Sequence, residues 1–332
     1  MKVLWVHNFD LNIQNSGVFM VNAAKELQDK GYNIDLFYTG NLRNPLNILK
    51  CQKTIKDKAK NYDIVHAQYG SACALTTLRV RNCATIVTLR GSDWNAIPTS
   101  SRLFNIHKKM AVMFTKASLK YYDIIVTVSE RMAEEVRKNY KEKEIFSLPS
   151  PIDLKRFLPI NKDTAKEKLG FKNNNEKWVL FTTISKSNAT KRYDLAKQAF
   201  DIAQKRNENI RFKVASGIPH ESMPSFVSAC DVILCTSISE GWPNSIKEAL
   251  ACNIPFVSTD VSDLKEIALK EKSCKVVQSI NPHVIADALC EVLNQNEPAN
   301  LRQYVEEMNM NNFTKNLISI YKTAISKFKN NK

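Results

Sequence analysis

Short apolar runs rich in β-branched residues alternate along this chain with longer amphipathic segments. In the first half, the apolar runs cover residues 3–7, 34–38, 64–67, 85–89 and 124–128. Apolar runs that alternate with helical segments are typical of a parallel sheet covered by helices on both faces. The alternation therefore predicts an α/β fold.

A second series of the same kind begins after residue 158. Its strands are predicted at 178–182, 211–215, 231–236 and 255–258, and its helices at 194–205, 223–230 and 245–252. Two such halves fit the usual domain size in a chain of 332 residues. We therefore predict two doubly wound domains, 1–157 and 158–312, that face a central cleft. An amphipathic C-terminal helix within 313–332 is expected to pack back towards the first domain.

Basic residues exceed acidic ones by 15, mostly in the first half of the chain. Residues 1–157 carry 24 Lys and Arg against 14 Asp and Glu, whereas residues 158–332 carry 24 against 19. A basic half favours an anionic partner, which could be nucleic acid, an acidic lipid surface or a phosphorylated substrate. Residues 102–120 mix apolar and basic side chains, a pattern that fits an interfacial membrane helix and a core helix equally well.

The cysteine pattern and the first residues bear on the cell compartment. None of the eight cysteines forms a CxxC pair, so we expect buried free thiols in a reducing compartment and no metal site. Residues 1–7 have the pattern of a strand rather than of a signal peptide, and no apolar run approaches the roughly 18 residues that span a bilayer. We expect a cytoplasmic protein, either free or peripherally attached to the inner face of the membrane.

The segment 239–251, with the sequence SEGWPNSIKEALA, carries the clearest chemistry. A strand is expected to end before it and a helix to start at Asn244 or Ser245. The free N–H groups and the positive dipole end of such a helix suit a diphosphate. Glu240 lies in the loop and Glu248 in the first turn of the helix. Glu248 also fits a capping box with Ser245.

This segment, the strand PFVSTD at 255–260 and Glu266-Ile267 together resemble glycosyltransferase family 4. That family carries two glutamates separated by seven residues, a PxVxTD strand and a downstream Glu-Ile. The resemblance implies the GT-B fold of two Rossmann-like domains. It also implies a retaining, metal-independent hexosyltransferase with a nucleoside diphosphate sugar as co-substrate and no other cofactor. Cell-surface polysaccharide, lipopolysaccharide or glycolipid synthesis is the expected setting.

The resemblance also assigns roles to single residues. Glu248 would bind the ribose hydroxyls, the catalytic Glu240 would contact the transferred sugar, and the catalytic Lys191 would hold the diphosphate. The other expected donor-binding residues are Gly17, Lys186 and Arg192. The backbone of Gly241, Trp242, Pro243, Asn244 and Ser245 would line the sugar and phosphate pocket. A solvated basic loop is the alternative for 185–192, and an ordinary turn before a helix is the alternative for Gly17.

Two positions depart from the family pattern. Ser185-Lys186 stands where Gly-Arg is usual, and Lys lacks the planar fork of Arg. Arg90 replaces His in the sequence RGSD at 90–93. Arg90 is placed at the catalytic centre and on the acceptor side, where it could bind an acidic acceptor. Asp93 either contacts the acceptor or caps the following segment. His66 is expected to be a satisfied structural histidine.

Other functions fit the sequence less well. A sugar-nucleotide epimerase would share the fold, but additional cleft histidines and carboxylates are missing. A nucleic-acid-binding protein is suggested by charge alone, without an aromatic and basic recognition motif. The expected partners are a nucleoside diphosphate sugar, a saccharide or lipid-linked acceptor and an anionic membrane surface, and nucleic acid is not expected.

Overall fold

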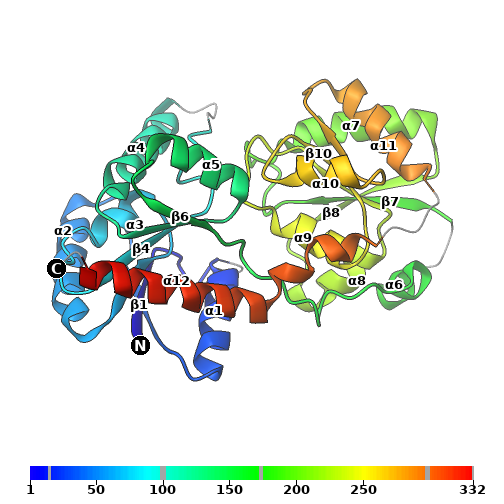
Figure 1. Ribbon diagram of the computed structural model, residues 1–332. Coiled ribbons are helices and arrows are strands. Elements are labelled where there is room, and N and C mark those ends of the chain that lie inside the picture. Colours follow the sequence, from blue (N-terminus) through cyan, green and yellow to red (C-terminus); the bar gives the residue numbers. More distant parts are fainter. Residues whose placement is uncertain (14–15, 98–101, 172–174, 296–299, 331–332) are drawn as a thin grey trace. The chain divides into compact units, whose positions relative to one another are not determined.

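The chain folds into two compact units, each described by itself (Figure 1). This computed structural model describes residues 1–13, 16–97, 102–171, 175–295 and 300–330. Unit 1 comprises Met1–Pro151 and Met310–Lys332, and unit 2 comprises Ile152–Asn309. The structure thus divides the chain after Pro151, where the sequence placed the boundary after residue 157. It also assigns the last helix to unit 1 from Met310, where the sequence placed that helix from 313.

Unit 1 contains a six-stranded sheet in the order β2-β1-β3-β4-β5-β6, with every neighbouring pair parallel. Its strands are β1 (Lys2–His7), β2 (Asn33–Tyr38), β3 (Ile64–Ala67), β4 (Ala84–Leu89), β5 (Ile124–Thr127) and β6 (Glu144–Ser147). The five expected strands are present to within one residue at each end. Buried residues fill β3, β4 and β5 completely, as expected for strands covered on both faces.

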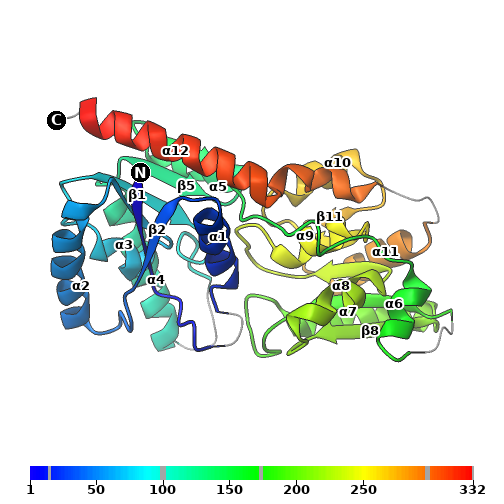
Figure 2. The ribbon, with the colours of Figure 1, turned by 90° about the horizontal axis from the view of Figure 1, so that it is seen from below.

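Helices cover both faces of this sheet. On one face, Val3 and Trp5 pack with α1 (Val18–Asp29) and α12 (Met310–Asn330). On the other face, the alternate strand residues pack with α2 (Pro45–Lys58), α3 (Ser71–Thr76), α4 (Arg102–Leu119), α5 (Glu130–Asn139) and the 3-10 turn η1 (Ala59–Asn61). In Figure 2, α12 lies on one side of these strands and α2, α3 and α4 lie on the other.

A buried hydrogen-bond network attaches α12 to the sheet. Trp5 Nε1 donates to the Tyr321 hydroxyl over 2.7 Å, and His66 Nδ1 lies 2.9 Å from the same oxygen. His66 Nε2 lies 2.7 Å from Thr88 Oγ1. Burial, reinforced by the charge of Arg90, lowers the pKa of His66 to about 3, so the ring is neutral. Both of its nitrogens have a partner, and His66 is the satisfied structural histidine that the sequence suggested.

Unit 2 contains a five-stranded parallel sheet in the order β11-β10-β9-β7-β8. Its strands are β7 (Lys177–Thr182), β8 (Ile210–Ala215), β9 (Val232–Cys235), β10 (Phe256–Thr259) and β11 (Lys275–Val277). The four expected strands are again present to within one residue at each end. Both units therefore have the doubly wound architecture that the sequence predicted.

The helices of unit 2 also lie on both faces of its sheet. One face packs against α7 (Tyr193–Arg206) and α11 (Pro282–Leu293). The other packs against α6 (Lys162–Lys168), α8 (Met223–Ser228), α9 (Asn244–Ala251) and α10 (Leu264–Lys270). The 3-10 turns are η2 (His220–Ser222), η3 (Leu301–Tyr304) and η4 (Glu306–Met308). Figure 1 shows α7 and α11 on one side of β7 and β8, with α6 and α8 on the other.

Two further expectations can be compared with the structure. Across the described ranges, every helix is too short or too polar to cross a bilayer. All eight cysteines are free thiols, and seven of them are buried, as expected.

Candidate functional site

The strand order of unit 2 reverses between β7 and β9. Strand β7 lies between β8 and β9, so the chain leaves it first towards one edge of the sheet and later towards the other. Ligands of doubly wound sheets bind at the carboxyl ends of the strands where the order reverses. The loops that leave β7 and β9 there are 183–192 and 236–243. They contain Lys186, Lys191 and Glu240, so the structure brings these three expected residues to one end of one sheet.

Lys191 and Glu240 form an ion pair between these two loops. Lys191 Nζ lies 2.6 Å from Glu240 Oε1, and Ser237 Oγ donates to the same oxygen over 2.8 Å. The side chains keep 23% and 18% of their exposure. Burial lowers the pKa of Lys191, but the charge and hydrogen bond of Glu240 outweigh it, so this pKa is raised. Over the described residues, Glu240 Oε2 accepts no hydrogen bond, and it is therefore open to a ligand.

Arg192 joins the two loops through backbone carbonyls. Its Nε donates to the Thr236 carbonyl over 2.6 Å and its Nη2 to the Ser237 carbonyl over 3.1 Å. Arg192 has a left-handed backbone, with a φ of 50°, where it precedes α7. The Thr236 hydroxyl donates back to the carbonyls of Lys191 and Arg192. These bonds make Arg192 a positioning residue that holds Lys191 opposite Glu240.

Lys186 is exposed on the first of these loops. Its ammonium lies 5.2 Å from the centre of the Tyr193 ring. It has no carboxylate partner in the part of the chain that the structure describes. Its charge is therefore available to a ligand at the carboxyl end of β7.

Helix α9 starts at Asn244, after Pro243, which provides no side-chain cap. The first helical hydrogen bonds run from the N–H groups of Ile246 and Lys247 to the Pro243 carbonyl. The N–H groups of Asn244 and Ser245 therefore precede the helical ladder and stay available to an anion. The preceding loop is held by Ser262 Oγ, which donates to the Gly241 carbonyl over 2.6 Å.

The start of α9 corrects one expectation. Because the helix begins at Asn244, Ser245 is already inside it and Glu248 lies beyond the first turn, so the capping box is wrong. Trp242 is 7% exposed and packs in the core of unit 2, with the Lys247 ammonium 5.7 Å from its ring centre. The backbone of Trp242, which the resemblance assigns to the pocket, is therefore the part of this residue that can line one.

Glu248 is half-buried on α9 and accepts no hydrogen bond from the described residues. Burial raises its pKa to about 7, against the charges of Lys247 and Arg156, which lower it. An ionised carboxylate is a pure acceptor. Glu248 is therefore an unsatisfied acceptor that a diol could fill.

In unit 1, Gly17 is explained by the backbone alone. It precedes α1 with a φ of 67°, and a Cβ atom there would lie 2.7 Å from Phe9 Cβ. Any residue with a side chain would combine this disfavoured backbone conformation with a clash against Phe9. This geometry favours the ordinary turn over a ligand role for Gly17.

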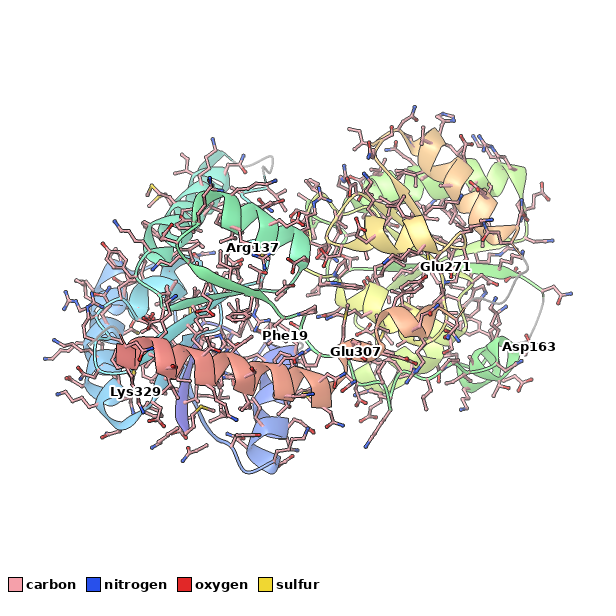
Figure 3. All side chains as sticks on the ribbon, in the orientation of Figure 1. Phe19, Arg137, Asp163, Glu271, Glu307 and Lys329 are labelled. Carbon is pink, nitrogen blue, oxygen red and sulfur yellow. The ribbon has the colours of Figure 1, made fainter. Side chains whose placement is uncertain are left out.

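Arg90 and Asp93 follow β4 in unit 1 and have different surroundings. Asp93 is fully buried, and its carboxylate accepts from the N–H groups of Gly70, Arg90 and Gly91 over 2.8–3.2 Å. These contacts favour the capping alternative. Arg90 is half-buried and lines a cavity of about 20 Å³. Phe19, labelled in Figure 3, lies in the first turn of α1, with the Arg90 guanidinium 4.3 Å from its ring centre.

The structure thus gathers most of the predicted residues in unit 2. Lys186, Lys191, Arg192, Glu240, Glu248 and the 241–245 backbone belong to it, whereas Gly17, Arg90 and Asp93 belong to unit 1. Sequence reasoning missed Ser237 and Gln68, which contact Glu240 and Arg90. Gln68 directly follows an expected strand, and that position could have flagged it. Within the described ranges, no group of three His, Cys, Asp or Glu side chains could hold a metal.

Two family models match the chain. Residues 18–156 match the model described as Glycosyltransferase Family 4, and residues 192–308 match the model described as Glycosyl transferases group 1. A Bacillus subtilis (strain 168) protein, named as a teichuronic acid biosynthesis glycosyltransferase, TuaC, is 24% identical over 255 residues. That match covers 71% of this chain and 63% of TuaC, so it spans less than two thirds of this relative's length.

Solved structures show the same fold. A sucrose-phosphate synthase from Thermosynechococcus elongatus superimposes with a TM-score of 0.75 at 15% identity, covering 98% of this chain and 100% of that one. The lipopolysaccharide outer core galactosyltransferase WaaB superimposes with a TM-score of 0.67 at 13% identity, covering 96% and 98%. Anabaena HepE, in complex with UDP and glucose, has a TM-score of 0.67 at 12% identity and covers 97% and 100%.

Proposed function

Because this chain belongs to glycosyltransferase family 4 and has the GT-B fold, we propose that it is a retaining hexosyltransferase. Its donor would be a nucleoside diphosphate sugar and its acceptor the hydroxyl of a saccharide or of a lipid-linked saccharide. Synthesis of a cell-surface polysaccharide, lipopolysaccharide or glycolipid is the setting that we propose. The name of TuaC, which refers to teichuronic acid, is in keeping with it.

The ion pair of Lys191 with Glu240 is the observation that carries this proposal. The pair lies where the strand order of unit 2 reverses, near the uncapped start of α9. The leaving nucleoside diphosphate gains negative charge in the transition state. The ammonium of Lys191, that of Lys186 and the N–H groups of Asn244 and Ser245 can stabilise this charge without a metal ion. Glu240 Oε2 remains to accept a hydroxyl of the transferred sugar.

The nucleotide would extend from the diphosphate towards Glu248. Two hydroxyls on neighbouring carbons can donate to the two oxygens of one carboxylate, which suits the ribose of a nucleotide. HepE and a starch synthase from Arabidopsis thaliana, two of the structures with this fold, are described as complexes with UDP and ADP. These complexes support a nucleoside diphosphate as the ligand class.

Retention of configuration would follow from departure and attack on one face of the sugar. The bond between the anomeric carbon and the diphosphate oxygen breaks, and a bond from that carbon to the acceptor oxygen forms on the same face. The proton of the acceptor hydroxyl passes to the departing diphosphate oxygen. Lys191 would stabilise the charge on the diphosphate throughout.

Replacing Lys191 or Glu240 by Ala tests the proposal. With a panel of nucleotide sugars, we expect each variant to lose about 100-fold or more in kcat, measured as nucleoside diphosphate release. Lys197→Ala is the matched control, because Lys197 also pairs with a carboxylate in unit 2, but on the exposed surface of α7. NMR of the product would report the anomeric configuration. Transfer that survives both Lys191→Ala and Glu240→Ala would place the site elsewhere, and donor isomerisation without any acceptor would indicate an epimerase.

An anionic membrane surface is the further partner that we propose, with α4 as its contact. Ile106, Met110 and Met113 are spaced for one face of α4 and are 54%, 41% and 56% exposed. Lys109 and Lys116 are exposed on the same helix. Val112 and Leu119 are buried at the same time, so α4 covers the core and also presents an apolar stripe. An apolar stripe beside lysines suits the interface of an acidic bilayer.

Vesicle sedimentation tests this contact. Wild-type protein should bind vesicles that contain phosphatidylglycerol more strongly than pure phosphatidylcholine vesicles. The double variant Met110→Gln, Met113→Gln should bind about tenfold more weakly. Each methionine side chain buries a large apolar area in the bilayer on binding, and glutamine does not. Leu46→Gln is the control, because Leu46 is 73% exposed on α2. Equal binding by the double variant and the wild type would contradict the role of α4.

A further inference from the structure

The carboxyl end of β4 in unit 1 presents a cation that has no acid as its partner among the described residues. Arg90 lines the cavity there and neither hydrogen-bonds to nor pairs with a carboxylate of the described residues. From this geometry we infer that Arg90 and Gln68 form a recognition site for an acidic group, a carboxylate or a phosphate, carried by the acceptor. This inference rests on the proposed function, because it takes the ligand to be the acceptor of the transfer.

The hydrogen bonds of Arg90 leave a fork for such a group. Nε donates to the Gln68 carbonyl over 2.7 Å, Nη2 to Gln68 Oε1 over 2.8 Å and Nη1 to Ser150 Oγ over 3.0 Å. A guanidinium has five N–H groups. Three of them donate to described residues, so among these residues one N–H is left over on each terminal nitrogen, and two such N–H groups can hold a carboxylate or phosphate.

The groups around Arg90 do not neutralise it in place of a ligand. The Phe19 ring stacks on the guanidinium, and His66 is neutral with both ring nitrogens engaged. Asp93 raises the pKa of Arg90 through its charge, but its oxygens are taken by backbone N–H groups. Burial lowers the pKa of Arg90 to about 10, so the side chain is charged at neutral pH.

Unsatisfied polar atoms surround the same end of the sheet. Five buried side-chain nitrogen or oxygen atoms of the described chain lack a partner, and three of them are His7 Nδ1, Asn8 Oδ1 and Gln68 Nε2. Gln68 is 2% exposed and lines the cavity. Such buried polar atoms require a partner, and none of the described residues provides one. Gln68 Nε2 is a second donor beside the Arg90 fork.

Strand register explains why these residues lie together. Trp5 and His66 are register partners on β1 and β3. Side chains two residues apart on a strand share a face, so His7 and Gln68 follow Trp5 and His66 on the same face. The Gln68 N–H donates to the Val6 carbonyl over 2.8 Å, which continues the pairing past both strands. His7 is therefore placed beside Gln68, where it can meet a hydroxyl of the same ligand.

The size of the cavity limits what can enter it. A volume of about 20 Å³ exceeds the roughly 10–15 Å³ that one water molecule needs, but it is far smaller than a sugar ring. Only the acid group of the acceptor would enter, and its ring would stay outside. A neutral acceptor would leave the fork of Arg90 unpaired, which discriminates against it.

The test compares the binding of methyl glucuronide, methyl glucoside and glycerol phosphate to the full chain by calorimetry. We expect wild-type protein to bind at least one of the two anionic probes about ten- to 100-fold more tightly than methyl glucoside. The glucuronide and the phosphate separate a carboxylate site from a phosphate site. Arg90→Gln should remove the preference, whereas Arg43→Gln, which removes the same charge from an exposed loop position, should keep it.

A second variant covers the case in which Arg90→Gln does not fold. Gln68→Glu keeps the side-chain size and gives Arg90 an internal carboxylate, and it should also remove the preference. UDP binding to the same proteins is measured in parallel. Equal affinity of wild type for all three probes, or an unchanged preference in Gln68→Glu, overturns the inference even when UDP binds. Absence of UDP binding by the wild type would instead count against the proposed function.

Discussion

The carboxylate of Glu248 is partly buried, and burial makes its ionisation less favourable. Its pKa is raised from near 4.5 to about 7. The charge of Glu248 therefore lowers the free energy of unfolding. This loss is absent below pH 4.5, grows between pH 4.5 and 7, and is complete above pH 7. We expect Glu248→Gln to raise the free energy of unfolding by about 1–2 kcal/mol at pH 8, a value reduced for partial exposure, and to leave it unchanged at pH 4.

Urea unfolding of wild type and Glu248→Gln between pH 4 and 9 measures this effect. Glu208→Gln, at an exposed position of unit 2, is the control and should show no such pH dependence. The same Glu248→Gln protein should bind UDP more weakly, because an amide offers only one oxygen to a diol. A variant destabilised at pH 8 would show that the carboxylate is satisfied in the fold.

The roles of several residues could not be decided from the sequence, and the reason is physical. The capping box of Ser245 and Glu248 requires a helix that starts at Ile246, and the start two residues earlier, at Asn244, removes it. Arg192 and Asp93 looked available for ligands because their partners are backbone groups: carbonyls of a distant loop for Arg192, and N–H groups of Gly70 and of its own turn for Asp93. Sequence alone does not show such contacts. The types of residue at the site could be predicted, but their partners could not.

At the scale of elements, α12 depends on a few buried contacts with the sheet of unit 1. Tyr321→Phe would leave Trp5 Nε1 without its acceptor and remove the partner of His66 Nδ1. Each buried polar group that loses its partner costs about 1–3 kcal/mol. We expect thermal unfolding of unit 1 to shift to lower temperature, whereas Tyr121→Phe, at a tyrosine that is 50% exposed, should leave it unchanged. Equal melting of both variants would mean that apolar contacts alone hold α12.

The central strands could be predicted because they are buried on both faces. Their apolar runs are continuous, and the expected ends are correct to within one residue. Strands β6 and β11 have only four and three residues, whereas the predicted edge strands β2 and β8 have six each. Runs this short and half-exposed are not recognisable, so β6 and β11 were missed. Helix α11 was also missed, although Asn281-Pro282 is a recognisable helix start.

At the scale of the whole molecule, the proposed donor residues are confined to one continuous stretch. Lys186, Lys191, Glu240, Glu248 and the start of α9 all belong to unit 2, residues 152–309. We expect this stretch, produced alone, to fold and to bind UDP, as measured by a rise in melting temperature. The Lys191→Ala form should lose most of that rise. A stretch that folds without binding UDP would assign part of the nucleotide site to unit 1.

Strand order is a property of the whole molecule that the pattern of apolar runs in the sequence does not reveal. The α/β pattern predicts parallel sheets, but the reversal between β7 and β9 depends on which strands are neighbours. The same holds for His7 and Gln68, which lie side by side only because β1 and β3 are paired. The fold class was therefore accessible, and the assembly of each site was not.

The return of α12 to unit 1 has a consequence for how the chain acquires its structure during translation. Trp5 and Tyr321 are hydrogen-bonded across 316 residues. At about 5–20 residues per second, a ribosome makes Tyr321 roughly 15–60 s after Trp5. Unit 2, made entirely in that interval, can fold first, while one apolar face of the unit 1 sheet waits for its last helix. Nascent chains of this protein would thus expose the part of this sheet face that α12 covers beside α1.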